Sequence, residues 1–235
     1  MPEAGDGRWA VYYAPPATHP LWRAACRWLG RDPESGETFA PPDDLGHDEW
    51  RALVDRPAGY GFHATLKPPF RLAAGKTSDD LRSRITDMAT GRTPFFIDGL
   101  RVARLDGFLA LRPTDSEPRL DALAADCVRL LDGLRRSPAG AELAGRRAGL
   151  THRQRSLLER WGYPYVFEEF RFHMTLTAPV DSIGERRARP VINELLGDAL
   201  DKRLPVDGVA LYHQPAPGTA FHLVERFPFS SRETR

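Results

Sequence analysis

The sequence predicts an α+β protein in which two related β-α-β-β units form pseudo-symmetric lobes, with antiparallel sheets that face a central cleft. First, an unusual phrase occurs twice, as "GFHATLKPPF" at 61–70 and as "RFHMTLTAPV" at 171–180, so that its histidines are 110 positions apart (173 − 63). Second, each phrase precedes a helical segment and then an alternating stretch that opens with apolar-Asp-Gly-apolar. This period is too long for a solenoid, so the copies are expected to face each other across a pseudo-two-fold axis.

The other elements follow from capping residues, turn glycines and prolines. Strands are expected at 9–15, within 94–113 and within 204–229, the last as a hairpin whose turn is at 214–219. Residues 31–47, rich in Pro, Gly and Asp, form a loop that is either a lid or a plain connection. Helices are expected at 19–30, 48–57, 77–91, 117–136, 151–162 and 183–200, with Pro57 closing the second and Pro190 at a break or a fresh start of the last.

The composition is that of an ordinary soluble globular protein. The chain has 235 residues, of which 41% are apolar and 28% charged, enough to bury a real core. We expect a single bilobal domain over 1–235, with lobes at about 1–115 and 116–235, each holding one copy of the phrase. Thirty-three Lys and Arg against 32 Asp and Glu leave a formal charge of +1, which argues against charge-driven binding to duplex nucleic acid or to an anionic membrane.

Two cysteines, Cys26 and Cys127, give neither a disulfide framework nor a metal-ligand spacing. No stretch approaches the roughly 18–20 apolar residues of a membrane span. The first ten residues, "MPEAGDGRWA", lack the charged and apolar regions of a secretory signal, so a cytoplasmic protein is expected.

Strand alternation assigns a chemical face to each phrase. Residues two apart share a face, so His63, Thr65 and Lys67 are expected to point one way. In the second phrase, His173, Thr175 and Thr177 share a face. When the two copies face each other, two imidazoles and two hydroxyls therefore converge on one cleft.

This set of side chains suits proton transfer at phosphorus. The ordinary pKa of His is about 6.5, so near pH 7 one histidine can be neutral and accept a proton while the other is charged and donates one. The hydroxyls of Thr65 and Thr175 can donate to phosphoryl oxygens, and Lys67 would add positive charge. The sequence contains no carboxylate cluster with ligand spacing, and we expect neither a metal nor another cofactor.

The paired H-x-T-L phrases resemble the signature of the 2H phosphoesterase superfamily. The wider context "YYAPP…GYGFHATLKPPF…FEEFRFHMTLT" is similar to a bacterial branch associated with phosphonate metabolism. The resemblance implies a bilobal α+β fold and a metal-independent phosphodiesterase acting on a small cyclic phosphodiester, with a ribose cyclic phosphate from phosphonate breakdown as one substrate. It implies that His63 and His173 are the catalytic pair and that Thr65 and Thr175 bind phosphate. Which histidine is the base stays open.

Weaker candidates surround this core. Arg171 lies two residues before His173 and shares its face, which favours a role beside Lys67 in binding phosphate. Tyr13, Tyr60 and Thr177 are candidate lining residues. Two alternatives stay open: RNA-end processing or 2′–5′ ligation, with a short RNA end as partner, and a non-catalytic module that binds a phosphorylated metabolite.

Overall fold

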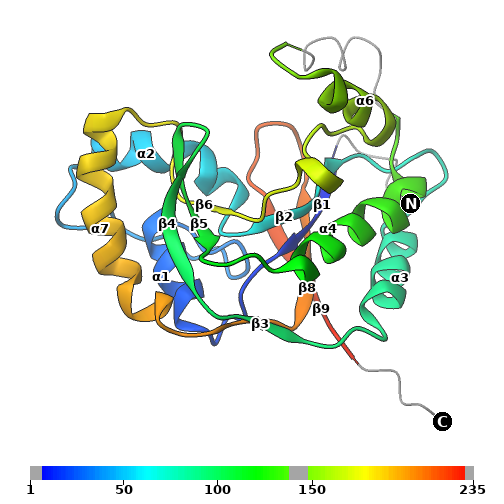
Figure 1. The fold of residues 1–235 in the computed structure, drawn as a ribbon, viewed down its shortest axis with the longest axis horizontal. Helices are drawn as coiled ribbons and strands as arrows, with labels where there is room; N and C mark the ends of the chain where they lie inside the picture. Colours follow the sequence, from blue (N-terminus) through cyan, green and yellow to red (C-terminus); the bar gives the residue numbers. More distant parts are fainter. Residues whose placement is uncertain (1–6, 138–147, 231–235) are drawn as a thin grey trace.

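The computed structural model describes residues 7–137 and 148–230 as an α+β fold built on antiparallel strands (Figure 1). A seven-stranded sheet has the order β4-β5-β6-β2-β1-β8-β9, and a second, two-stranded sheet pairs β3 with β7. The strands are β1 (Arg8–Tyr13), β2 (Ala64–Phe70), β3 (Phe95–Ile97), β4 (Leu100–Leu105), β5 (Phe108–Pro113), β6 (Met174–Thr175), β7 (Leu204–Val206), β8 (Gly208–Gln214) and β9 (His222–Pro228).

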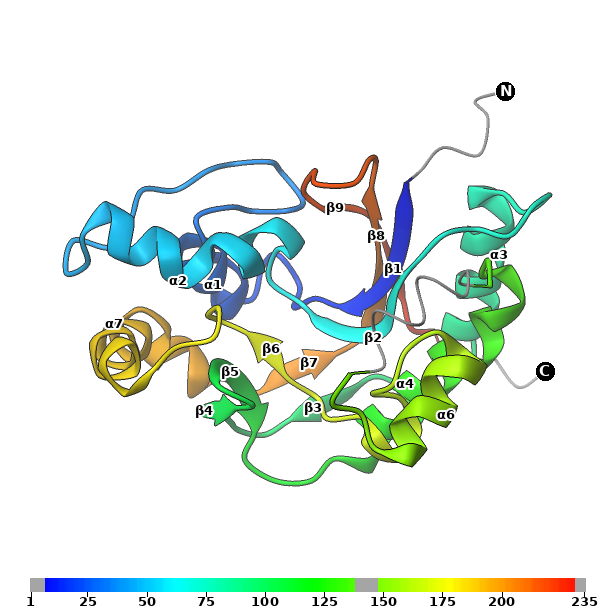
Figure 2. The same cartoon turned by 90° about the horizontal axis from the view of Figure 1, so that it is seen from above.

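The helices form two groups on opposite sides of the molecule, with α1, α2 and α7 in one group and α3, α4 and α6 in the other (Figures 1 and 2). None of the helices in the described ranges is both long and apolar enough to cross a membrane. The helices are α1 (Pro20–Leu29), α2 (His47–Tyr60), α3 (Ser78–Ala89), α4 (Pro118–Leu131), α6 (His152–Trp161) and α7 (Ser182–Leu200), with 3₁₀ turns η1 (Asp132–Leu134) and η2 (Phe167–Glu169).

The two repeats are related by the expected pseudo-two-fold arrangement. Ala64, which follows the first histidine, is paired with Met174, which follows the second. In the same way β3 and β7, which occupy equivalent places after the two phrases, pair antiparallel through Phe96 and Pro205. Equivalent residues lie opposite each other when a local two-fold axis passes between them. The axis therefore passes between the two H-x-T-L strands.

The repeats share one continuous sheet instead of forming two facing sheets. The β4–β5 hairpin, which belongs to the first repeat, pairs with β6 of the second. Conversely, β8 and β9 of the second repeat join β2 of the first through β1. A boundary near residue 115 thus separates the repeats along the chain but not in space, because each hairpin is built onto the other repeat's histidine strand.

Several predicted boundaries differ from the structure; the helix expected at 117–136, for example, ends at Leu131 and continues as the 3₁₀ turn η1. Helix α2 continues through Pro57 to Tyr60 and is capped by Gly61, where the backbone turns to a φ of +77°. Helix α7 is continuous through Pro190. The second phrase forms only the two-residue strand β6, because Leu176 and Thr177 both donate their N–H groups to Leu109 O and end the regular ladder.

The core fixes the helices behind the histidine strands. Trp28 of α1 is fully buried and donates its indole N–H to Leu176 O over 2.8 Å. Trp50 of α2 donates in turn to Trp28 O, also over 2.8 Å. Cys26 and Cys127 are buried free thiols. The chain after β6 is therefore held from behind by two indole hydrogen bonds in series.

Residues 31–46 form a connection whose first part is anchored beside the first histidine phrase. The guanidinium of Arg31 donates to Ala58 O at 3.2 Å and to Phe221 O at 2.7 Å. The carbonyl of Pro33 accepts from Leu223 N at 2.9 Å. These bonds tie this part of the loop to α2 and to the last hairpin.

Candidate active site

Four polar side chains form a square on one face of the sheet. Because Ala64 lies opposite Met174 in antiparallel strands, His63 lies opposite Thr175 and Thr65 lies opposite His173. All four are partly exposed, whereas Ala64 and Met174 on the other face are buried. Directly opposite Cβ atoms in such a pair are about 4.5–5.5 Å apart and diagonal neighbours about 7–8 Å. The histidines therefore occupy one diagonal of the square and the threonines the other.

Both imidazoles are held in the same way. Nδ1 of His63 lies 2.9 Å from Gly61 O, and Nδ1 of His173 lies 2.7 Å from Arg171 O. A carbonyl oxygen can only accept, so Nδ1 carries the proton on each ring and Nε2 of the neutral ring is left as an acceptor. Nε2 of His63 lies 3.2 Å from the hydroxyl of Thr65. The same bond to the carbonyl two residues earlier thus sets the tautomer in both repeats.

Burial lowers the pKa of both histidines. The pKa of His63 falls to about 4, chiefly because burial disfavours its charged form; the bond to Gly61 O opposes this, and the charge of His173 adds to it. Burial likewise lowers the pKa of His173, with the Arg171 carbonyl opposing and the charge of Arg112 adding. Near pH 7 both rings are therefore neutral without ligand, whereas the sequence suggested one neutral and one charged. A bound phosphate anion would raise either pKa.

Lys67 does not share the face of the histidines. Tyr12 is paired with Thr65, but Val11 is paired with Lys67, so Leu66 is an extra residue in β2, a β-bulge. The bulge shifts the alternation by one, which turns Lys67 to the face covered by α4. There its ammonium donates to Val128 O at 3.3 Å and is only 2% exposed. The structure therefore does not bring the ammonium of Lys67, which was expected to add positive charge, to the face of the two histidines.

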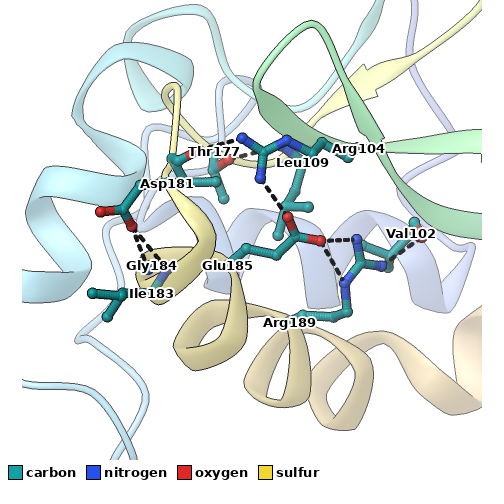
Figure 3. A network of polar contacts seen from close by, with 10 residues as sticks. Val102, Arg104, Leu109, Thr177, Asp181, Ile183, Gly184, Glu185 and Arg189 are labelled. Carbon is teal, nitrogen blue, oxygen red and sulfur yellow. Dashed lines mark hydrogen bonds and ion pairs between the residues drawn. The ribbon is translucent and has the colours of Figure 1, made fainter.

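Two of the candidate lining residues also face away from the cleft. Tyr13 is paired with Ala64 on the buried face, and its hydroxyl donates to Pro205 O at 2.7 Å. Thr177 is buried, and its hydroxyl accepts from Leu109 N at 2.9 Å, so it links the chain after β6 to β5 (Figure 3). Tyr13 and Thr177 therefore contribute to packing and to hydrogen bonds with the backbone.

Tyr60 and Arg171 lie beside the histidines. The ring centroid of Tyr60 is 6.1 Å from that of His63, and Tyr60 also stacks on Phe221 at 5.2 Å. Arg171 is exposed, and its backbone carbonyl holds the ring of His173. A role of either side chain in binding substrate stays a prediction.

The sequence did not predict two further residues that lie beside the histidines. Tyr12 is fully buried and stacks on His63 with ring centroids 3.8 Å apart. Arg112 of β5 follows Leu111, which is paired with Met174, so Arg112 lies opposite His173 on the cleft face. Tyr12 belongs to a strand that the apolar pattern predicted, but only the strand order places either residue beside a histidine.

A charged network holds the segment that follows the second phrase (Figure 3). Glu185 of α7 accepts from Arg104 of β4 and from Arg189, in both cases at 2.6 Å. Asp181 caps α7 by accepting from Ile183 N and Gly184 N. The network ties the start of α7 to the β4–β5 hairpin, which flanks the strand of His173.

Besides the square, two other kinds of site matter among the described residues, a metal cluster and a cavity away from the square. No group of three or more His, Cys, Asp or Glu within 7–137 and 148–230 is arranged to hold a metal ion. A cavity of about 560 Å³ lies between α1, α7 and residues 39–44 and shares no lining residue with the square.

Two curated proteins from bacteria are similar to this chain in sequence. The chain is 37% identical over 220 residues to a protein of Laribacter hongkongensis (strain HLHK9) named ribose 1,5-bisphosphate phosphokinase PhnN. The aligned region covers 92% of this chain and 50% of the relative. A protein of the same name from Janthinobacterium sp. (strain Marseille) is 36% identical over 236 residues, 97% of this chain and 52% of the relative. The chain thus spans about half the length of these curated relatives.

Among solved structures, crystal structures of E. coli LigT in complex with NADP+ and with 3′-AMP are similar at TM-scores of 0.43 and 0.38. Their sequence identities are 15% and 12%, and each comparison covers 96% of this chain and 99% of LigT. A family model described as a protein of unknown function, DUF1045, matches residues 65–222, which is more than half of the chain. The chain belongs to this family.

Proposed function

We propose that this chain is a phosphodiesterase that opens a small cyclic phosphodiester by general acid–base catalysis between His63 and His173. The observation that supports this most strongly is the square in which two identically oriented imidazoles flank one space and two hydroxyls flank it on the other diagonal. The same arrangement agrees with the resemblance of the two H-x-T-L phrases to the 2H phosphoesterases.

The strongly lowered pKa of His63 favours it as the base and His173 as the acid. His63, whose pKa falls to about 4, stays neutral and acts as the base, so its Nε2 takes a proton from the attacking water. The new bond joins the water oxygen to phosphorus while the bond from phosphorus to the leaving oxygen breaks. His173, charged once the substrate anion has raised its pKa, donates its Nε2 proton to that oxygen. The product is a phosphate monoester with a free hydroxyl.

The threonines hold the phosphoryl oxygens. The hydroxyl of Thr65, which contacts Nε2 of His63 in the free protein, turns to a non-bridging oxygen when substrate binds. Thr175 does the same from the other corner of the square. Such donors count most when negative charge develops in the transition state. No step calls for a metal ion, so activity is expected to survive EDTA.

A ribose cyclic phosphate is the proposed substrate. The relatives named ribose 1,5-bisphosphate phosphokinase act, by that name, on a ribose that carries two phosphates. Opening a ribose cyclic phosphate yields a ribose phosphate monoester, which is the class of compound that such a kinase consumes. This link supports a place in phosphonate metabolism next to that kinase.

The test measures the turnover of a ribose 1,2-cyclic phosphate and of nucleoside 2′,3′-cyclic phosphates in the presence of EDTA. Phosphorus NMR monitors the products. His63→Gln and His173→Gln are each expected to lose about 10²–10⁴-fold in kcat. The exposed His47→Gln serves as the control for removal of a histidine. Full activity in either site variant would refute the assignment, and loss of all activity with EDTA would refute metal independence.

A further inference from the structure

An arginine pair extends the site face beyond His173. Ala110 is paired with Thr175 and Leu111 with Met174, so the next pair on the cleft face is Arg112 with His173. One strand further out, Arg101 of β4 is paired with Arg112 and is exposed. The two guanidinium-bearing residues therefore lie in one row with His173 and Thr65.

Arg112 has an unsatisfied donor. Its Nε is buried and has no hydrogen-bond partner within the part of the chain that the structure describes. The positive charge of Arg112 reaches His173, whose pKa it lowers. A buried donor without a partner is costly and uncommon in native proteins. By contrast, Arg104 on the other face of β4 is paired with Glu185 and with Val180 O. Arg112 can thus donate a hydrogen bond to a group of the bound substrate.

The position of Arg112 points to a second anion, separate from the phosphate in the square. The centre of the square lies midway between β2 and β6, so β5 is one and a half strand spacings away, about 7 Å. A phosphate at the centre already finds donors in Thr65 and Thr175. An anionic group a few bonds further along the same small molecule would lie over Arg112.

We propose that Arg112, supported by Arg101, forms an anion subsite for a phosphate monoester on a substrate whose cyclic diester occupies the square. Arginine binds phosphate through paired N–H groups in a planar fork, which a lysine cannot copy. This inference rests on the proposed function and restricts the class of substrate that the site takes. The preferred substrate is a sugar that carries a phosphate monoester besides its cyclic phosphate.

The kinetic test compares a ribose 1,2-cyclic phosphate with and without a 5-phosphate, each variant at the pH of its own maximum. Arg112→Gln is expected to lower kcat/KM at least tenfold more for the 5-phosphorylated substrate than for the other. Arg101→Gln should also lower the ratio of kcat/KM for the 5-phosphorylated substrate to kcat/KM for the other, but by a smaller factor. Arg84→Gln, which removes an exposed charge from α3, should change neither value. Equal losses on both substrates, or no loss, would overturn the subsite and leave the proposed function standing.

A binding test separates this inference from the reaction itself. Titration calorimetry with ribose 5-phosphate is expected to give at least a tenfold higher Kd for Arg112→Gln than for the wild type and Arg84→Gln. If the wild type opens no cyclic phosphate but this difference appears, the proposed function fails and the subsite stands. Equal Kd values in all three proteins, or no binding to the wild type, would overturn the subsite.

Discussion

Tyr12 stacks on His63, with ring centroids 3.8 Å apart and an interplanar angle of 23°. Tyr12 is fully buried in β1, and burial raises the pKa of its hydroxyl well above the usual range. Its ring covers one face of the imidazole and so contributes to the burial that lowers the pKa of His63. A residue on the neighbouring strand thus helps to bury the proposed base.

The pH dependence of kcat/KM should reflect the two lowered pKa values. His63 must be neutral, so the rate constant is expected to rise as the pH increases through about 4. His173 must be protonated, so it should fall again as the pH rises through a pKa that lies below 6.5. The maximum is therefore expected between about pH 4 and 6.5. A profile measured with the ribose cyclic phosphate that peaks above pH 7 would contradict the assigned roles.

The same pKa predicts a loss of stability in acid. Between pH 6.5 and about 4 the unfolded chain binds a proton at His63 that the folded protein does not, so the free energy of unfolding falls as the pH is lowered. The contribution is at most about 3 kcal/mol, from 1.36 kcal/mol per pKa unit. Urea unfolding of His63→Gln should show a shallower pH slope over this window than that of the control His47→Gln. Identical slopes would show that His63 is not buried in its neutral form.

Substitution of Lys67 separates a structural role from a catalytic one. Lys67→Met is expected to change kcat/KM less than twofold, because the bulge at Leu66 turns this side chain away from the cleft. Burial lowers the pKa of Lys67 to about 8, so the wild type gains stability as the pH rises from 8 to 10.5. Lys67→Met should lack this gain, whereas the exposed Lys76→Met should keep it. A tenfold loss of kcat/KM in Lys67→Met would place the ammonium in the site after all.

Gly61 couples backbone geometry to the orientation of His63. Its φ is +77°, and an added Cβ would lie 2.6 Å from Cγ of Pro33. Gly61→Ala is expected to destabilise the protein by about 1–3 kcal/mol and to lower kcat as its carbonyl moves away from His63 Nδ1. Gly36→Ala is the matched control, since Gly36 has a φ of +80° but no atom near its added Cβ. Equal stability and activity of the two variants would show that the contact with Pro33 is easily relieved.

The doubled phrase predicted that His63, His173 and the two threonines come together, but it did not predict how. The square arises because the two strands pair directly within one sheet, whereas the sequence predicted two sheets facing each other. The helices were also predictable from their caps, as with Thr77 and Thr151, which both form capping boxes.

What strand alternation could not predict depends on long-range pairing. The bulge at Leu66 arises only when β2 meets β1, and it reversed the expected direction of Lys67. Arg112 carries no local signal, because its place beside His173 follows from the exchange of the β4–β5 hairpin onto the other repeat. Alternation within one strand says nothing about which strand lies next to it.

The most direct test of the central claim is a double-substitution cycle for the two histidines. The kcat/KM for the ribose cyclic phosphate is measured for the wild type, His63→Gln, His173→Gln and the double variant. If both imidazoles act on one phosphorus atom, the double variant should be within a few-fold of the slower single variant, because removing either group already disables the unit. Losses that multiply in the double variant would contradict joint action.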